Sequence, residues 1–369
     1  MWELTGGLLA GTVATLAVLV PVAAAVFVRR RWQAWLAALL AQLLAVSAVF
    51  LLVNRHYEFF ATWDDLVGVP GQVGRLTQVK ERGAKAVPVQ KIAISSDNPH
   101  PLGEVVTMPV PDSSPAYATA SVYLPAAYFE PGQRAHRFPV VVMVAGLGMP
   151  GPKFAHLLDA VTQNSTVIDE GRASPFVAVY VGGSIVTGID SECVDVPGAP
   201  QQTFLGADLP SAIAQHYRVT ADHTRWFIAG WSTGGYCAAL MTATHPRVYA
   251  AGAALAGYYH PIFDDQHLLD TPAAPDRTAA VTAENDLVRM VTTRQLIHLR
   301  LLNVMSTADD QSWGTVTGPP DGPDGRRFHQ AARSLPGVAF QLVKGGGHRF
   351  GTYLPLYDPS LAWLGTAGL

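Results

Sequence analysis

The pattern of hydrophobic and polar residues divides the chain into an apolar beginning and a mixed remainder. Residues 4–28 and 32–53 contain no charged side chain, and each stretch exceeds the roughly 20 residues that a helix needs to cross a bilayer. Three arginines lie between them, and the positive-inside rule places this short loop in the cytoplasm and both chain ends outside. We therefore expect two transmembrane helices within residues 1–53. A cleaved signal peptide, which the acidic third residue disfavours, and two buried helices of a soluble protein are the alternatives.

A connector is expected at residues 54–87. Aromatic side chains follow the second apolar stretch closely, and they could lie among lipid headgroups or pack on the globular domain: Tyr57, Phe59, Phe60 and Trp63. Glycines and a proline then interrupt any regular structure, at Gly68, Pro70, Gly71 and Gly74.

The rest of the chain, residues 88–369, alternates short apolar runs with helix-forming stretches. Continuous apolar runs are typical of strands that are buried on both faces, as in a parallel sheet covered by helices. The strands are predicted at 92–95, 118–124, 140–144, 176–181, 226–229, 299–305 and 338–343, and the helices at 153–161, 207–216, 234–244 and 286–297. This alternation predicts one α/β domain whose ligands bind beyond the carboxyl ends of the strands.

Charge and cysteine content exclude some classes of function. The net charge is −3, only 14% of the residues are charged, and no basic stripe stands out. The two cysteines, Cys193 and Cys237, form no CxxC or zinc-binding pattern. We therefore predict neither a nucleic-acid partner nor a zinc site.

Ser232 is the candidate nucleophile. It is the centre of Gly230-Trp231-Ser232-Thr233-Gly234, a G-x-S-x-G pattern with a predicted strand before it and a predicted helix after it. In that setting the serine lies on a strained turn with its hydroxyl exposed, and the two glycines leave room for the neighbouring strand and helix. The pattern occurs often by chance in a chain with 34 glycines, and a flexible turn would explain the glycines but not their positions. The context therefore favours a nucleophile.

The general base and its acid partner should follow the serine, with the acid first. His348 comes directly after the last predicted strand and three glycines, whereas the other eleven histidines lie before the serine or in less suitable places after it. Asp309 follows the penultimate predicted strand and is expected to orient the imidazole. Asp310 is the alternative, and either aspartate could simply cap the following turn.

An oxyanion hole needs two backbone N–H groups. One is expected from Thr233, which follows the nucleophile, and the other from the loop after the third strand of the fold. That loop is Ala145-Gly146-Leu147-Gly148, and Leu147 is the expected donor. In isolation the same loop would be read as a plain glycine-rich turn.

With these motifs, the chain resembles the putative-esterase (esterase D-like) family of α/β-hydrolases, which includes the actinobacterial mycolyltransferases. The resemblance covers about residues 88–369 and rests on Ala145-Gly146-Leu147, Gly230-Trp231-Ser232-Thr233-Gly234-Gly235, Ser306-Thr307-Ala308-Asp309 and Gly346-Gly347-His348. It implies an α/β-hydrolase fold and either carboxyl-ester hydrolysis or acyl transfer through an acyl-serine intermediate, with no metal or cofactor. Mycolyltransferases usually use glutamate as the acid and are secreted, whereas here the candidate is an aspartate and the domain is tethered.

We therefore predict a membrane-anchored serine esterase whose catalytic domain lies outside the cell and accepts a small-molecule or lipid acyl ester. An acyltransferase acting on envelope glycolipids and a non-catalytic surface binding module are the alternatives. Residues 257–294, which include Tyr258, Tyr259 and Phe263, are expected to form the rim of the acyl pocket or a lid. Outside the cell Cys193 and Cys237 could form a disulfide, and an unpaired buried Cys237 is an equal alternative.

Overall fold

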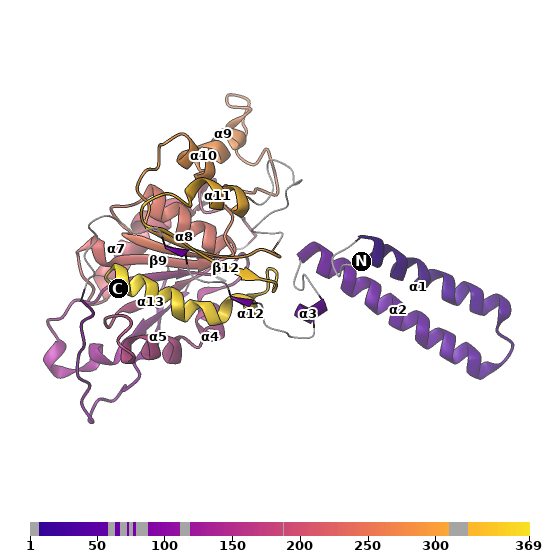
Figure 1. The fold of residues 1–369 in the computed structure, drawn as a ribbon, viewed down its shortest axis with the longest axis horizontal. Coiled ribbons are helices and arrows are strands. Elements are labelled where there is room, and N and C mark those ends of the chain that lie inside the picture. The colour runs from indigo at the N-terminus through magenta and orange to yellow at the C-terminus, as the bar shows by residue number, and fades with distance from the viewer. Residues whose placement is uncertain are drawn as a thin grey trace.

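Two long helices form a hairpin that projects from the globular part of the molecule (Figure 1). The computed structural model describes residues 7–57, 63–66, 72–73, 77–78, 88–110, 119–186, 188–309 and 324–369. Helices α1 (Gly7–Phe27) and α2 (Arg31–Tyr57) are long and apolar enough to cross a membrane. Only 6% and 11% of their apolar windows are buried, so these side chains face outward, unlike those of a core helix.

A mixed sheet forms the centre of the globular domain. Among the described residues it has ten strands, in the order β1 (Gln72–Val73), β12 (Val338–Lys344), β11 (Leu301–Ser306), β10 (Ala251–Leu255), β9 (Trp226–Trp231), β5 (Val140–Val144), β6 (Val177–Val181), β4 (Thr119–Leu124) and β3 (Glu104–Pro109), with β2 (Thr77–Gln78) also paired to β12. The six neighbours from β6 to β12 run parallel; β1 and β2 pair antiparallel with β12, β4 pairs antiparallel with β6, and β3 pairs antiparallel with β4. The carboxyl ends of the parallel strands therefore meet at one edge.

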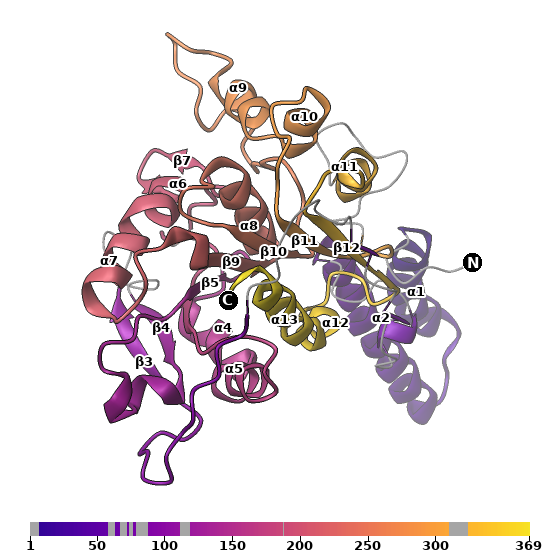
Figure 2. The same ribbon diagram turned by 60° about the vertical axis from the view of Figure 1, so that its left-hand side comes forward.

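Helices cover both faces of this sheet (Figure 2). One face carries α4 (Gly151–Leu157), α5 (Ala160–Asp169) and α13 (Tyr357–Ala367), and the other carries α7 (Leu209–His216), α8 (Thr233–Thr244), α9 (Arg277–Glu284), α10 (Leu287–Thr292) and α11 (Gly325–Ala332). The remaining short elements are α3 (Trp63–Leu66), α6 (Gln201–Thr203), α12 (Phe350–Tyr353), the β7–β8 pair (Asp195–Val196 and Ala199–Pro200), a π-helical turn (Phe204–Asp208) and four 3-10 turns (Ala126–Phe129, Pro131–Gln133, His223–Arg225 and Leu354–Leu356). All residues of β5, β6, β10 and β11 are buried, which explains the continuous apolar runs of β5 and β6.

The structure corrects some of the predicted elements. Residues 92–95 form no strand, because the N–H and hydroxyl of Ser95 both bind the Glu130 carboxylate. The helix predicted at 153–161 is divided into α4 and α5 at Asp159, whose φ of 47° is left-handed. Strand β10 was not predicted, because its Ala-Gly-Ala-Ala-Leu sequence lacks β-branched and aromatic residues. Most of the connector at 54–87 lies outside the described residues.

Candidate active site

Ser232 occupies a sharp turn between β9 and α8. Its φ of 60° and ψ of −124° are unusual for a residue with a Cβ, and its N–H donates to the carbonyl of Leu255 at 2.9 Å. The flanking glycines are required by packing. A Cβ on Gly230 would lie 2.2 Å from the carbonyl oxygen of Gly234, and one on Gly234 would lie 2.1 Å from that of Val144. The turn therefore presents the serine hydroxyl at the carboxyl edge of the sheet.

His348 reaches this serine from the far end of the chain. It follows β12 after Gly345, Gly346 and Gly347, which all have positive φ, a conformation that glycine adopts without strain. The Nε2 atom of His348 lies 2.8 Å from Ser232 Oγ. With Nδ1 carrying the ring proton, Nε2 is free to accept the serine hydroxyl proton.

Asp309 holds the other side of the imidazole. It follows β11, has no exposed surface, and its two carboxylate oxygens lie 3.0 and 2.9 Å from His348 Nδ1. The hydroxyl of Tyr353 donates to the same carboxylate at 2.9 Å. Hydrogen bonds to a buried carboxylate favour its charged form, which would keep Nδ1 protonated. Asp310, the alternative acid, lies outside the described residues.

Two backbone N–H groups lie near the serine in the elements expected for an oxyanion hole. Thr233 is the first residue of α8, so its N–H has no acceptor within the helix. Leu147 lies in the loop after β5, and among the described residues its N–H donates to no backbone carbonyl. A Cβ on Gly146 would lie 3.4 Å from Ser232 Cβ, so this loop passes directly beside the serine.

Three aromatic residues that sequence reasoning did not assign complete the surroundings of the histidine. The Trp231 ring packs against the His348 ring with their centroids 5.4 Å apart, and Phe350 contacts Trp231 edge-on. Tyr353 binds Asp309 as described above. Trp231 lies inside the G-x-S-x-G pattern, whereas nothing in the sequence distinguishes Phe350 or Tyr353 from core aromatics.

A disulfide supports the helix that follows the nucleophile. Cys193 and Cys237 are joined, with their Cα atoms 5.3 Å apart, and both side chains are fully buried. The bond attaches the turn at Asp190–Cys193 to the first part of α8. The alternative of an unpaired Cys237 is therefore wrong for this structure.

Three aromatic residues of the segment expected to form the rim of the acyl pocket are buried in the core. Tyr258, Tyr259 and Phe263 are 7%, 0% and 3% exposed and belong to the main hydrophobic core. The Tyr259 ring stacks on Phe328 of α11 with 3.8 Å between centroids. These three aromatic residues therefore fill the space between sheet and helices and form no exposed rim, while a rim or lid formed by other parts of residues 257–294 stays a prediction.

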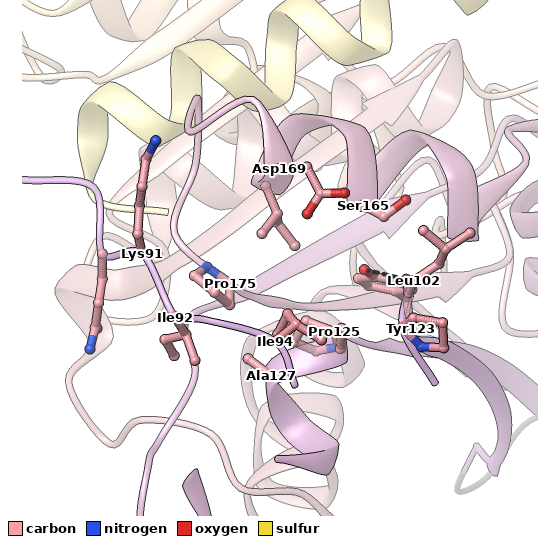
Figure 3. Close-up of a pocket in the computed structure, with 14 residues that line it drawn as sticks. Lys91, Ile92, Ile94, Leu102, Tyr123, Pro125, Ala127, Ser165, Asp169 and Pro175 are labelled. Carbon is pink, nitrogen blue, oxygen red and sulfur yellow. Dashed lines mark hydrogen bonds between the residues drawn. The ribbon is translucent and has the colours of Figure 1, made fainter. Parts of the chain in front are cut away.

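The hollow drawn in Figure 3 lies far from the serine. Its cavity volume is about 120 Å³, and it is lined mainly by apolar side chains, with Lys91 and Asp169 among the lining residues. Tyr123 in its wall pairs with Ala178 near the beginning of β6, which is the amino edge of the parallel strands. Ser232 lies at the opposite edge, so this hollow is separate from the candidate active site. Among the described residues no group of three or more His, Cys, Asp or Glu side chains could hold a metal ion.

Comparison with known families gives a match to most of the globular domain. A family model described as Putative esterase matches residues 115–339. An uncharacterized protein of Corynebacterium glutamicum is 32% identical over 152 residues, which are 41% of this chain and 34% of that protein. The chain thus matches about a third of the length of this curated relative.

Solved structures share the fold. A ferulic acid esterase superposes with a TM-score of 0.55 and 20% identity, over 73% of this chain and 99% of that one. The fluorophosphonate-binding serine hydrolase F of Staphylococcus aureus gives 0.52 and 13%, over 72% and 99%. The S-formylglutathione hydrolase of Agrobacterium tumefaciens gives 0.52 and 17%, over 71% and 93%. These likenesses, all at low identity, show that the globular domain has the α/β-hydrolase fold.

Proposed function

Because this chain belongs to the Putative esterase family, we propose that it is a carboxylic ester hydrolase in which Ser232 is the nucleophile, His348 the general base and Asp309 the acid that orients it. The observation that carries the proposal is the continuous chain of contacts from Ser232 Oγ through both imidazole nitrogens to the buried Asp309 carboxylate. A serine turn without a catalytic role would not be expected to contact a histidine that lies 116 residues further along the chain.

The proposed reaction has two halves. His348 Nε2 takes the hydroxyl proton as Ser232 Oγ attacks the ester carbonyl carbon, and the N–H groups of Leu147 and Thr233 bind the resulting oxyanion. The intermediate collapses, and the alcohol leaves with the proton from His348. Water then gives a proton to His348 and attacks the acyl-serine, which releases the carboxylic acid and restores the serine hydroxyl.

We further propose that residues 1–53 anchor the enzyme through two membrane spans, that 54–87 form the juxtamembrane connector to the globular domain, and that 88–369 form the catalytic domain outside the cell. The exposed apolar surfaces of α1 and α2 support the anchoring. The arginines at 29–31 support a cytoplasmic helix connection. The disulfide supports an oxidising compartment for the catalytic domain.

The catalytic proposal is tested with the full chain in detergent micelles. Wild type, Ser232→Ala and a matched Ser211→Ala control, whose serine is exposed on α7, are treated with a fluorophosphonate probe and with short and long p-nitrophenyl esters. We expect labelling and turnover in wild type and Ser211→Ala and neither in Ser232→Ala. A folded wild type that is unlabelled and inactive would instead favour a binding module.

The membrane proposal needs its own measurement. Alkaline carbonate washing should leave the full chain in the membrane fraction, since two apolar spans resist extraction. Protease added to intact spheroplasts should digest a C-terminal epitope tag. Extraction by carbonate would contradict the anchor, and a protected tag would contradict the orientation.

A further inference from the structure

A buried carboxyl group lies behind the proposed oxyanion hole and has no part in the mechanism above. Glu192 is 3% exposed, and its carboxylate oxygen accepts a hydrogen bond from the N–H of Ile262 at 3.1 Å. Its side chain also bonds to Tyr258. Burying a carboxyl group costs free energy unless hydrogen bonds compensate for the lost water, so the partners of Glu192 are informative.

The contacts of Glu192 lead directly to the residue that follows the nucleophile. The Tyr258 hydroxyl donates to Thr233 Oγ1 at 3.1 Å. The Tyr258 ring is held by stacking on Tyr236, with centroids 5.1 Å apart and planes 21° apart. A connected row of side chains therefore runs from Glu192 through Tyr258 to Thr233, whose N–H is one of the two proposed oxyanion donors.

The backbone at Glu192 and Cys193 is in a conformation that costs conformational free energy. Glu192 and Cys193 have φ values of 48° and 57°, both in the left-handed region that residues with a Cβ seldom adopt. The disulfide to Cys237 attaches this turn to α8, five residues after Ser232. Strained backbone that its surroundings maintain is typical of functional sites, where it fixes the position of a side chain.

We propose that Glu192 and Tyr258 are positioning residues that hold Thr233, and with it one donor of the oxyanion hole, in its catalytic geometry. The inference rests on the proposed function, because it assigns these residues a role in that same reaction. Neither side chain is placed in contact with the reacting atoms, so both act through Thr233.

The row of hydrogen bonds through Tyr258 can run in either direction, because the hydroxyl protons of Tyr258 and Thr233 rotate. Tyr258 can give its one hydroxyl proton to the Glu192 carboxylate or to Thr233 Oγ1, and the Thr233 hydroxyl can donate to Tyr258 in return. Burial, and secondarily the nearby Asp190, raise the pKa of Glu192 well above its ordinary value, whereas the hydrogen bonds from Tyr258 and from the N–H of Ile262 oppose that rise. In either direction of these hydrogen bonds Tyr258 bridges Glu192 and Thr233, which is what the positioning role requires.

The experiment compares kcat, KM and the affinity of a boronic acid inhibitor in the full chain. The boronate forms a tetrahedral anionic adduct with the serine, so its binding reports the oxyanion hole, whereas KM for a short ester does not. Complete loss of one oxyanion donor costs about 10²–10³ in turnover, and a displaced donor should cost part of that. For Tyr258→Phe we expect kcat and boronate affinity to fall together by about 10-fold, with KM nearly unchanged.

Matched variants separate positioning from a general structural effect. Tyr249→Phe also removes a buried tyrosine hydroxyl, but one that donates to the carbonyl of Leu205 and is outside this row, so kcat should stay at the wild-type level. Glu192→Gln keeps a neutral donor and an acceptor and should retain activity, whereas Glu192→Ala should match Tyr258→Phe. The double variant Tyr258→Phe/Glu192→Ala should be no worse than the poorer single variant. If Tyr258→Phe does not fold, Thr233→Val removes the same contact from the other side and should show the same loss.

The outcomes distinguish the two proposals. Wild-type kcat and boronate affinity in Tyr258→Phe or Thr233→Val, with Ser232 still labelled by fluorophosphonate, would overturn the positioning role and leave the esterase proposal intact. Equal losses in Tyr249→Phe and Tyr258→Phe would also overturn it, because the effect would then be structural. A wild type that is not labelled at Ser232 would refute the esterase proposal itself.

Discussion

Replacing Asp309 by asparagine tests the proposed acid most directly. The carboxylate has no exposed surface and accepts from His348 Nδ1 with both oxygens, at 3.0 and 2.9 Å. Asparagine has nearly the same shape but only one acceptor oxygen, and Tyr353 also donates to this group. If the amide N–H₂ turns toward His348, Nδ1 must accept, the proton moves to Nε2, and Nε2 can no longer take the proton of Ser232. Burial prevents water from supplying the missing acceptor.

The expected loss of activity in Asp309→Asn is large, because His348 can no longer act as the general base in most molecules of this variant. Asparagine at the acid position of a Ser-His-Asp triad lowers kcat by about 10⁴, which is about 5 kcal/mol of transition-state stabilisation. KM should change little, because Asp309 is fully buried and not exposed to the ester. The assay is p-nitrophenyl ester turnover, normalised to folded protein by circular dichroism.

Two companion variants make the result specific. Asp310→Asn, at the alternative acid, should keep near wild-type kcat. Tyr353→Phe leaves the Asp309 charge and removes one donor to it, so we expect a loss of about 10-fold or less in kcat. It also deprives the N–H of Ser306 of an acceptor, which should lower the free energy of unfolding by about 1–3 kcal/mol. Asp309→Asn with more than a tenth of wild-type kcat, or a large loss in Asp310→Asn, would refute the assignment.

Three further predictions concern stability. In urea titrations the free energy of unfolding of Ser232→Gly should exceed that of Ser232→Ala by about 0.5–2 kcal/mol, because glycine relieves the strain of the positive φ by more than it adds flexibility to the unfolded chain. Equal free energies of unfolding would show that the turn is unstrained. The pKa of Glu192 is raised above its ordinary 4.5, so the folded state binds more protons than the unfolded state at pH values above 4.5. The free energy of unfolding of the wild type should therefore fall as pH rises from 4.5 to the raised pKa, by about 1.4 kcal/mol for each unit by which the pKa is raised, and Glu192→Gln should not show this fall. The same pH dependence of the melting temperature in both proteins from pH 4 to 8 would contradict the prediction. Replacing both Cys193 and Cys237 by alanine opens a loop with a sequence separation of 44. This should lower the free energy of unfolding by about 2–4 kcal/mol, measured from the shift of the urea midpoint. An unchanged midpoint would show that the disulfide does not stabilise the fold.

Features that depend on a few neighbouring residues could be predicted from the sequence. The two uncharged stretches predict the α1–α2 hairpin, and the strand–turn–helix pattern around Ser232 predicts its tight turn. His348 could be named because glycines and a predicted strand precede it. The apolar run of β5 was predicted with its observed bounds, since a strand buried on both faces leaves a continuous local signal.

Contacts between distant segments were decided only by the tertiary structure. The sequence left Asp309 and Asp310 as alternatives, and the fold brings Asp309 to His348 across 39 residues. It left Cys193 and Cys237 paired or unpaired, and the fold brings them together. Nothing local marked Glu192, because a carboxyl group is buried only when distant atoms cover it.

The physical reason is the same in each case. Secondary structure and tight turns follow from steric and hydrogen-bonding preferences within a few residues, which the sequence pattern carries directly. Which side chains meet at the edge of a sheet depends on the order of its strands, and that order results from packing the whole core at once. For this protein the sequence therefore determined the kinds of residues at the site, and the tertiary structure decided which of them are in contact.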